Sequence, residues 1–272
     1  MKLFLSFLSF ASLLAICAPQ AVRAQNRPMS DPFGQVTIFA GGGVSYYMGD
    51  ISASSGSGHL GLGPAFMLGG SYRLTERVSA RGELRLYKVS GDSQYTNNPE
   101  KNLSFVATNP DLMLSAQVDL FPYSKRARVN PYGLLGLGVT YLTPKAEWDG
   151  VVYSLPRYQT EGHKYWRLPL FVTGGLGAMV RISNSWSAGI ELTGNFLFSD
   201  YLDDVSTVYP EYDQLGSNEA FNLSYRGSAQ QPGYIRGNPK SKDIYAILAA
   251  RVSYSLPNPR YARERKITKC SR

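Results

Sequence analysis

The stretch Trp186–Phe198, WSAGIELTGNFLF, alternates between apolar and polar residues along almost its whole length. Ile190 and Leu192 fall on the apolar face, whereas Glu191 and Asn195 fall on the other. Successive side chains of a β-strand point to opposite sides, so this period of two predicts a strand with one apolar face and one polar face.

The same alternation recurs along the chain, and long helical periodicity is hard to find. It predicts eight strands, in the segments Gln35–Met48, Leu62–Leu74, Val78–Val89, Asp111–Phe121, Tyr132–Leu142, Trp166–Ile182, Trp186–Phe198 and Asp243–Leu256. Each is near or above the ~9–11 residues with which a tilted strand crosses a bilayer. Gly41, Gly42 and Gly43 lie inside the first segment, where glycine predicts close packing or barrel curvature.

The connections between these segments alternate between short and long. The short ones are 75–77, 122–131 and 183–185, and the long ones are 49–61, 90–110, 143–165 and 199–242. Short turns on one side and long loops on the other are typical of outer-membrane barrels. We therefore predict an all-β fold, an eight-stranded antiparallel transmembrane β-barrel with short periplasmic turns and long extracellular loops.

A soluble β-sandwich also alternates, and there the apolar face would be the core. Two features favour the barrel. The polar faces carry charges of both signs, as an interior network would: Arg81, Glu83, Arg85, Asp119, Arg181, Glu191 and Arg251. Aromatic residues lie near the ends of the apolar faces, as an interfacial girdle would: Tyr72, Tyr141, Trp166, Trp186, Phe196, Phe198 and Tyr254.

The interior of an eight-stranded barrel is just wide enough for its side chains to fill. Charged side chains that point inward must pair, because an unpaired buried charge is very costly. We therefore expect the seven charged residues to form a structural plug in the lumen rather than a conducting path. Function would then lie in the loops, the rim or the tail.

The two ends of the chain differ in composition from its middle. An almost wholly apolar run from Leu3 to Ala18 and a small-residue site at Ala24 predict a removed signal peptide at residues 1–24. We expect residues 25–34 to form an N-terminal periplasmic segment, 35–256 the barrel, and 257–272 a basic periplasmic tail.

The formal net charge of +8 is concentrated in these ends. Without Lys2 and Arg23 the chain carries +6, and the tail carries +5 because six cations oppose Glu264, so the rest carries about +1. A nearly neutral body excludes a basic nucleic-acid-binding face. Outer-membrane lipids are the partners that we expect for the barrel itself.

The sequence offers little for catalysis or metal binding. After the signal peptide the chain keeps one cysteine, Cys270, and two histidines, His59 and His163, which are too few for a zinc-type or His-rich site. The carboxylates near the start of the longest loop lack the ligand spacing of a calcium loop. Ser, His and Asp residues in the loops permit a surface hydrolase, but such trios are common by chance. We expect no catalytic, cofactor-binding or metal-binding residues.

Two stretches resemble a known family. The first predicted strand and its exit read FAGGGVSYYMGDI at Phe39–Ile51, and the longest loop opens with SDYLDDVSTVYP at Ser199–Pro210. Together with the strand count, they resemble the PorG-type outer-membrane barrels of Bacteroidota, which belong to the type IX secretion machinery and support gliding motility. The loop motif within the second stretch consists of Asp200, Tyr201, Asp203 and Asp204.

The resemblance implies a non-catalytic component of protein transport that associates with a periplasmic ring built from a lipoprotein and its partner protein. The residues themselves offer a candidate contact for this ring in the tail, at Arg260, Arg263, Arg265, Lys266 and Lys269. A generic small outer-membrane barrel for envelope anchoring or adhesion is the alternative, followed by a small porin or a surface enzyme. Asp203 and Asp204 also have a plainer explanation, since such residues order the start of a loop by binding backbone amides.

Overall fold

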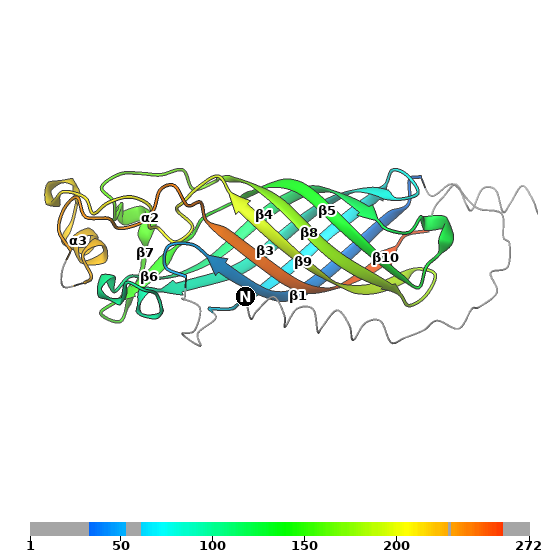
Figure 1. The fold of residues 1–272 in the computed structure, drawn as a ribbon, viewed down its shortest axis with the longest axis horizontal. Helices are drawn as coiled ribbons and strands as arrows, with labels where there is room; N and C mark the ends of the chain where they lie inside the picture. Colours follow the sequence, from blue (N-terminus) through cyan, green and yellow to red (C-terminus); the bar gives the residue numbers. More distant parts are fainter. Residues whose placement is uncertain (1–32, 53–60, 228–229, 258–272) are drawn as a thin grey trace, which may run out of the picture. The chain divides into compact units, whose positions relative to one another are not determined.

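A computed structural model describes residues 33–52, 61–227 and 230–257. Its eight long strands are β1 (Val36–Met48), β2 (Gly63–Arg73), β3 (Val78–Asp92), β4 (Ser104–Asp119), β5 (Val129–Thr140), β8 (Leu170–Arg181), β9 (Trp186–Leu197) and β10 (Ile244–Ser255). They pair in the order β3-β2-β1-β10-β9-β8-β5-β4, and pairing of β3 with β4 closes the sheet. The prediction of a closed eight-stranded antiparallel barrel is confirmed (Figure 1).

Residues 1–32 and 258–272 lie outside the described residues. They hold the expected signal peptide, most of the expected N-terminal segment and the basic tail, so those interpretations stay predictions.

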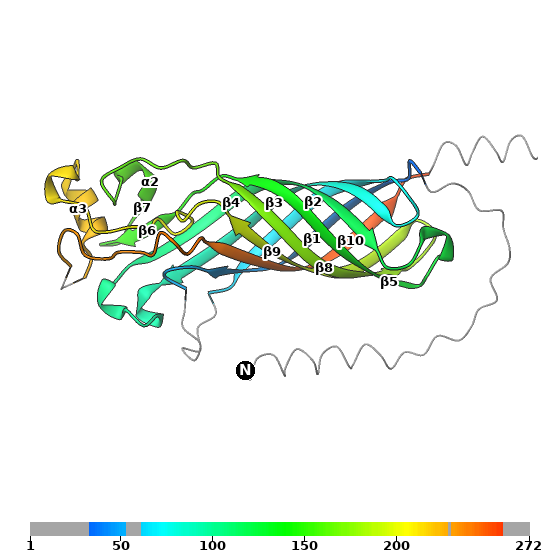
Figure 2. The same cartoon turned by 45° about the horizontal axis from the view of Figure 1, so that its top comes forward.

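The long connections carry the remaining elements. These are η1 (Ser93–Tyr95), η2 (Pro99–Lys101), β6 (Lys145–Trp148), β7 (Val151–Ser154), α2 (Leu155–Tyr158), η4 (Tyr212–Gln214) and α3 (Asn218–Ser224). Figure 1 shows β6, β7, α2 and α3 together beyond one end of the barrel strands, and Figure 2 shows the same grouping after rotation. Within the described part of the chain, no helix is both long and apolar enough to cross a membrane.

At the other end of the barrel, the described strands are joined by short turns, one of which contains η3 (Tyr123–Lys125). Side-chain hydroxyls stabilise two of these turns. The Oγ1 of Thr75 accepts a hydrogen bond of 3.0 Å from the backbone N–H of Val78, and the Oγ of Ser183 accepts one of 3.1 Å from Trp186. Such bonds satisfy turn amides that have no strand partner. The short connections are therefore encoded locally.

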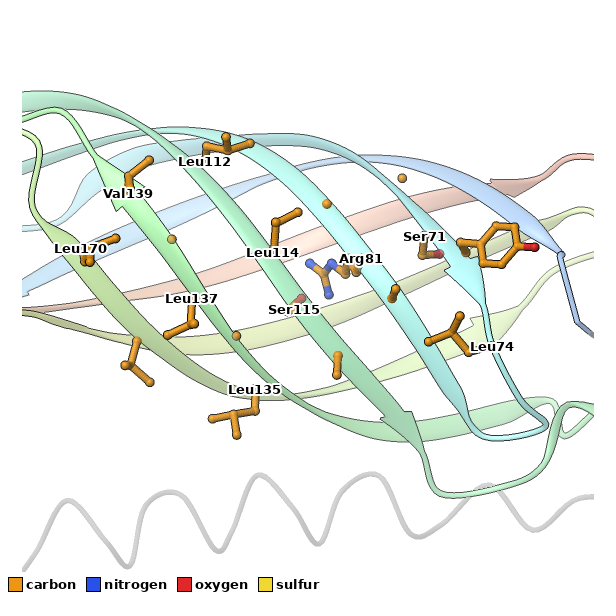
Figure 3. A pocket seen from close by; sticks show the side chains of 18 of the residues that line it. Ser71, Leu74, Arg81, Leu112, Leu114, Ser115, Leu135, Leu137, Val139 and Leu170 are labelled. Atoms are coloured by element: carbon orange, nitrogen blue, oxygen red, sulfur yellow. The ribbon is translucent and has the colours of Figure 1, made fainter.

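The alternating pattern places leucine on the outside and charge on the inside of the barrel. The side chains of Leu114 and Leu135 are 65% and 67% exposed, whereas Arg81 is only 2% exposed. Figure 3 shows Leu112, Leu114, Leu135 and Leu137 on the outer surface, where they line a shallow apolar hollow, with Arg81 behind the strands. An apolar outer surface around a polar interior is what a membrane-spanning barrel requires.

Aromatic side chains lie at two levels of the outer surface. Tyr72, Trp186 and Tyr254 lie near the turn end, where the Trp186 and Tyr254 rings are 4.9 Å apart. At the loop end, Trp166 and Phe198 are 75% and 65% exposed. Two such levels match the aromatic girdles that flank the apolar band of outer-membrane barrels.

The interior changes from polar to apolar towards the loop end. There Val89, Phe105 and Leu142 are buried with Leu202 and Val205 of the longest loop in one hydrophobic cluster. The strands thus enclose charge at the level of the lipid and an ordinary apolar core beyond it.

This change explains why two predicted loops are wrong in extent. Strand β4 begins at Ser104 instead of Asp111, and β3 continues to Asp92 instead of Val89. Towards the loop end the inward positions are apolar, for example Phe105 and Ala107. The expected pattern of polar inward and apolar outward residues therefore does not continue there. The predicted loop 143–165 likewise contains the β6–β7 hairpin, whose strands are only 4 residues long each.

Two glycines allow β1 and β10 to approach closely. A Cβ added to Gly43 would lie 2.0 Å from the carbonyl oxygen of Leu248, and one added to Gly41 would lie 2.6 Å from that of Ala250. At Gly42 the nearest atom would be 3.6 Å away. The prediction of close packing is confirmed for Gly41 and Gly43.

We expect Gly43→Ala to destabilise the barrel by about 1–3 kcal/mol or more, because the added methyl group overpacks the seam between β1 and β10. Unfolding by urea in detergent, followed by tryptophan fluorescence, measures the change in free energy. Gly42→Ala is the matched control and should leave the unfolding curve almost unchanged. Equal effects of the two substitutions would contradict the proposed close approach.

Candidate functional site

Arg81 on β3 is the centre of a buried ion network in the lumen. Its Nε donates to Oε2 of Glu83 at 2.8 Å, and its Nη2 donates to Oε1 of Glu191 at 2.8 Å. The Tyr132 hydroxyl donates to the other oxygen of Glu191 at 2.6 Å. The alternation of each strand aims these side chains inward, and the curvature of the closed sheet brings them together.

Arg85 forms a second cluster one step further along β3. Its Nε donates to Oδ1 of Asp111 at 2.7 Å, and its Nη2 donates to Oδ1 of Asn195 at 2.9 Å. The Tyr245 hydroxyl donates to the second oxygen of Asp111 at 2.7 Å. An ion pair of 3.9 Å between Arg85 and Glu83 joins the two clusters.

The clusters bridge strands that are not neighbours in the sheet. Arg81 on β3 reaches Glu191 on β9, although β2, β1 and β10 separate these strands in the sheet order. Charged and aromatic side chains therefore cross the lumen. This geometry fills the centre of the barrel and is poorly suited to a wide diffusion path.

The structure separates the seven predicted lumen charges into two groups. Arg81, Glu83, Arg85, Glu191 and Arg251 lie together in the centre, where Nη1 of Arg251 is 3.4 Å from Oε2 of Glu191. Asp119 and Arg181 line a pocket at the turn end, which Arg251 also lines from the side of the central group. There the partner of Asp119 is Arg73, at 2.8 Å.

Two charged members of these clusters, Arg73 and Asp111, are not among the seven predicted lumen charges. Both lie within predicted strands, and Asp111 has the inward parity, so strand alternation was the signal that could have identified it. Arg73 stands at the end of β2, where the alternation does not decide which way a long side chain turns.

The loop motif forms part of a buried cap at the other end of the barrel. Leu202, Asp203 and Asp204 are all buried. Oδ1 of Asp203 accepts a hydrogen bond of 2.9 Å from the backbone N–H of Val205, which is the loop-ordering role that short acidic side chains favour. The ring of Tyr201 stacks on that of Tyr165 at 4.2 Å. The three carboxylates of the motif, Asp200, Asp203 and Asp204, are buried inside the cap, whereas Tyr201 is half-buried.

Glu161 and Arg236 hold the motif from two other parts of the chain. Nη1 of Arg236 donates to Oε1 of Glu161 at 2.9 Å, and the same carboxylate accepts the backbone N–H of Ser206 at 2.8 Å. The Thr207 hydroxyl donates to Oε2 at 2.7 Å. Although burial alone would raise it, Arg236 and these donors lower the pKa of Glu161. No sequence signal links Glu161 with Arg236, because they belong to different loops.

A second set of contacts ties the motif to the exit of β1. The Tyr47 hydroxyl donates to Oδ2 of Asp203 and, at 3.3 Å, to Oδ1 of Asp243. The backbone N–H of Leu202 donates to Oδ2 of Asp243 at 2.9 Å. Burial, and then the neighbouring carboxylates, raise the pKa of Asp203 well above its usual value. Burial likewise raises the pKa of Asp204 to about 6.

The described part of the cap contains no cluster of metal ligands. Within 33–52, 61–227 and 230–257, no three or more His, Cys, Asp and Glu side chains are grouped to hold a metal ion. Nε2 of His163 lies 2.9 Å from the Tyr201 hydroxyl, and its Nδ1 lies 2.9 Å from the carbonyl oxygen of Glu161. Both ring nitrogens therefore take part in the cap, and His59 lies outside the described residues.

Comparison with known proteins identifies a family. A family profile described as "Outer membrane protein beta-barrel domain" matches residues 8–227, which is more than half of the chain. No curated protein sequence matches.

Several solved barrels resemble the fold. Neisserial surface protein A is 10% identical, with 81% of this chain and 97% of that chain covered and a TM-score of 0.46. The N-terminal barrel of Pseudomonas aeruginosa OprF is 12% identical, covering 82% and 98%, with a TM-score of 0.40. Ail of Yersinia pestis is 14% identical, covering 82% and 99%, with a TM-score of 0.37. At these identities the likeness concerns the fold alone.

We expect Arg81→Gln to lower the free energy of unfolding by about 3–5 kcal/mol, because it leaves the buried carboxylates of Glu83 and Glu191 without their main partner. Urea unfolding in detergent measures the loss. Arg77→Gln removes the same charge from an exposed turn and should change stability by less than about 0.5 kcal/mol. An unchanged curve for Arg81→Gln would show that the lumen network contributes nothing to stability.

The raised pKa values predict a cap that is more stable in mild acid than at neutral pH. A carboxyl whose pKa is raised by folding contributes stability that is fully present below its unfolded pKa of about 4 and is lost as the pH rises through the folded pKa. Hydrogen exchange of residues 199–209, corrected for intrinsic rates, should therefore be at least about tenfold faster at about pH 8 than at about pH 5.

Asp203→Asn should recover much of the protection that is lost at the higher pH, because the asparagine amide is neutral at both pH values. Asp213→Asn, on an exposed position of the same loop, is the control and should leave the pH dependence intact. If Asp203→Asn instead lowered protection equally at both pH values, the cap would need an ionised Asp203 for its stability. The explanation by a raised pKa of Asp203 would then be wrong.

Proposed function

The chain belongs to the outer membrane protein β-barrel domain family, and on that premise we propose that it is a non-catalytic component of a protein-secretion machinery of the type IX class. It is a small outer-membrane barrel. In the proposed role it binds periplasmic ring proteins and does not transport substrates through its own lumen.

The contact between Tyr47 and Asp203 carries this proposal. Tyr47 lies in Phe39–Ile51 and Asp203 in Ser199–Pro210, the two stretches that resemble PorG-type barrels. A second contact ties the first stretch to a later part of the longest loop, since the backbone N–H of Asn238 donates to Oδ2 of Asp50 at 2.6 Å. Stretches that are distant in sequence thus form one structural unit, which supports a shared origin of both motifs over two chance matches.

The filled lumen supports an interaction role over a pore. The network around Arg81 and Arg85 crosses the barrel, so the surfaces open to partners are the cap, the lipid-facing wall and the turn end. Of these, the turn end faces the periplasm, where a secretion ring would lie. Arg77, Lys125, Arg126 and Arg128 are exposed there.

Association of the basic tail with an acidic face of the ring extends this proposal. The contact residues would be Arg260, Arg263, Arg265, Lys266 and Lys269. Complementary charge accelerates encounter and selects the partner. The lipoprotein of the ring and its partner protein are the expected binding proteins.

Envelope anchoring or adhesion is a second candidate, favoured by the surface of the cap. Tyr212, Phe221, Tyr234 and Ile235 are exposed on the loop between β9 and β10. Exposed apolar side chains in one region mark interaction surfaces. An adhesive barrel would bind its target through these residues. Deletion of its gene would leave secretion unaffected.

The secretion role predicts that the tagged protein recovers the periplasmic ring proteins from gently solubilised outer membranes. Deletion of residues 260–272, or replacement of the five basic tail residues by Gln, should lower that recovery at least about tenfold, because the charge complementarity is lost. An affinity tag inserted at the exposed Gly216 leaves both chain ends unaltered.

Lys240→Gln with Lys242→Gln is the matched control, since it removes exposed positive charge from the opposite end of the barrel. Unchanged recovery after tail deletion would exclude the tail as the docking segment. Recovery of the barrel alone, together with normal secretion after gene deletion, would exclude the secretion role and leave the envelope barrel.

A further inference from the structure

The turn end of the lumen contains a small polar pocket of about 110 Å³. Side chains from all eight barrel strands line it, together with residues of the turns. Hydroxyl groups are abundant on its wall, at Ser71, Ser79, Ser187, Ser253 and Ser255. Three arginines, Arg73, Arg181 and Arg251, face a single carboxylate, Asp119. The pocket therefore has an excess of positive charge.

The carboxylate of Asp119 is fully engaged within the pocket. Its Oδ2 accepts a hydrogen bond of 2.8 Å from Nη2 of Arg73, and its Oδ1 accepts one of 2.8 Å from Nε2 of Gln117. It thus neutralises Arg73 and leaves the other two arginines to be compensated by other groups.

Arg251 is almost completely buried, at 4% exposure, yet is poorly satisfied. Its guanidinium packs against the rings of Phe39 and Tyr132, at 4.7 Å and 5.3 Å from their centroids. Its Nη1 lies 3.4 Å from Oε2 of Glu191, and neither Nη1 nor Nε makes a hydrogen bond among the described residues. Glu191 is meanwhile held by Arg81 and Tyr132 at shorter range.

Arg181 is the second cation that Asp119 leaves uncompensated. It is half-buried at the end of β8, and its charged group lies 5.9 Å from the centroid of the Tyr123 ring. No ion pair joins it to any acidic side chain of the described residues. Its position nearer the turns places it between Arg251 and the exterior of the barrel.

A buried guanidinium with free N–H groups is costly, and a carboxylate that accepts those hydrogens removes much of the cost. We propose that this pocket is an anion-binding site that receives one carboxylate side chain from a periplasmic protein. The carboxylate would accept hydrogen bonds from Arg181 and Arg251, and serine hydroxyls of the wall would donate to it.

The position of the pocket decides where that carboxylate comes from. It lies inside the ring of strands, so lipid headgroups around the barrel do not face it. Its volume suits the end of one acidic side chain and not a folded segment. Exposed Arg77, Lys125, Arg126 and Arg128 on the adjoining turns would attract an acidic protein surface towards it.

The site rests on the proposed function only for the identity of the protein that supplies the carboxylate, because the binding itself is measurable on the isolated barrel. The full-length protein, labelled with ¹⁵N-arginine and held in detergent micelles, reports on each guanidinium through its Nε–Hε signal. N-acetylglutamate amide is the probe, at constant ionic strength, and its methyl ester is the neutral reference.

We expect saturable shifts of the Arg181 and Arg251 signals with the carboxylate probe, and none with the ester. Arg181→Gln should weaken the binding seen at Arg251 at least tenfold, whereas Arg181→Lys should retain part of it. Arg77→Gln removes the same charge from an exposed turn outside the pocket and should change the affinity less than twofold. Because no carboxylate of the described residues pairs with Arg181, its replacement should leave the barrel folded, and the remaining arginine signals verify this.

Three results would overturn the site: no saturable shift, equal weakening by Arg77→Gln, or binding of inorganic phosphate without binding of the carboxylate probe. Two outcomes separate the pocket from the proposed function. If the purified barrel binds the probe saturably but the tagged protein recovers no ring proteins from outer membranes, the pocket is supported and the secretion role is refuted. Loss of ring recovery with Arg181→Gln, but not with Arg77→Gln, would support both.

Discussion

Closure of the hydrogen-bonded sheet is the constraint on which the rest of the structure depends. In hydrocarbon no water satisfies an unpaired backbone amide or carbonyl, so an open strand edge is not tolerated. Pairing of β3 with β4, in register from Val78 opposite Val118 to Asp92 opposite Ser104, removes that edge. A closed ring of eight strands leaves an interior with room only for side chains. The dense network around Arg81 follows from this geometry.

The polarity of the barrel interior depends on whether lipid or water surrounds the outer face at the same height. Where lipid covers the outside, inward charges are compensated in the lumen, Glu83 by Arg81 and Arg85 by Asp111. Beyond that level the outer face meets water, and the interior becomes an apolar core that includes Phe105 and Leu202. The longest loop folds back onto this core. The cap is thus a continuation of the barrel and has its own polar network around Glu161.

The two ends of the barrel offer different chemistry to partners. In the cap, acidic groups such as Asp203 and Asp204 are buried and engaged, and exposed aromatic side chains dominate one loop. At the turn end, positive charge is exposed on the turns and also recessed in the mouth of the lumen. An acidic periplasmic protein would meet attraction at long range from the turns and a specific contact at Arg181.

The sequence by itself determined the number of strands, their inward and outward faces and the side with short turns, because a period of two and local turn residues are encoded within each segment. Trp186–Phe198 is enough to identify such a strand. Only the tertiary structure decided which charges meet, since Arg81 and Glu191 lie on strands that closure of the barrel brings face to face. It also decided the true start of β4 and the burial of Asp203, because both depend on a core beyond the bilayer that forms from distant segments. Contacts across a closed lumen join distant segments and leave no local pattern in the sequence. The alternation that points each side chain into the lumen is local, and it can be read from each segment alone.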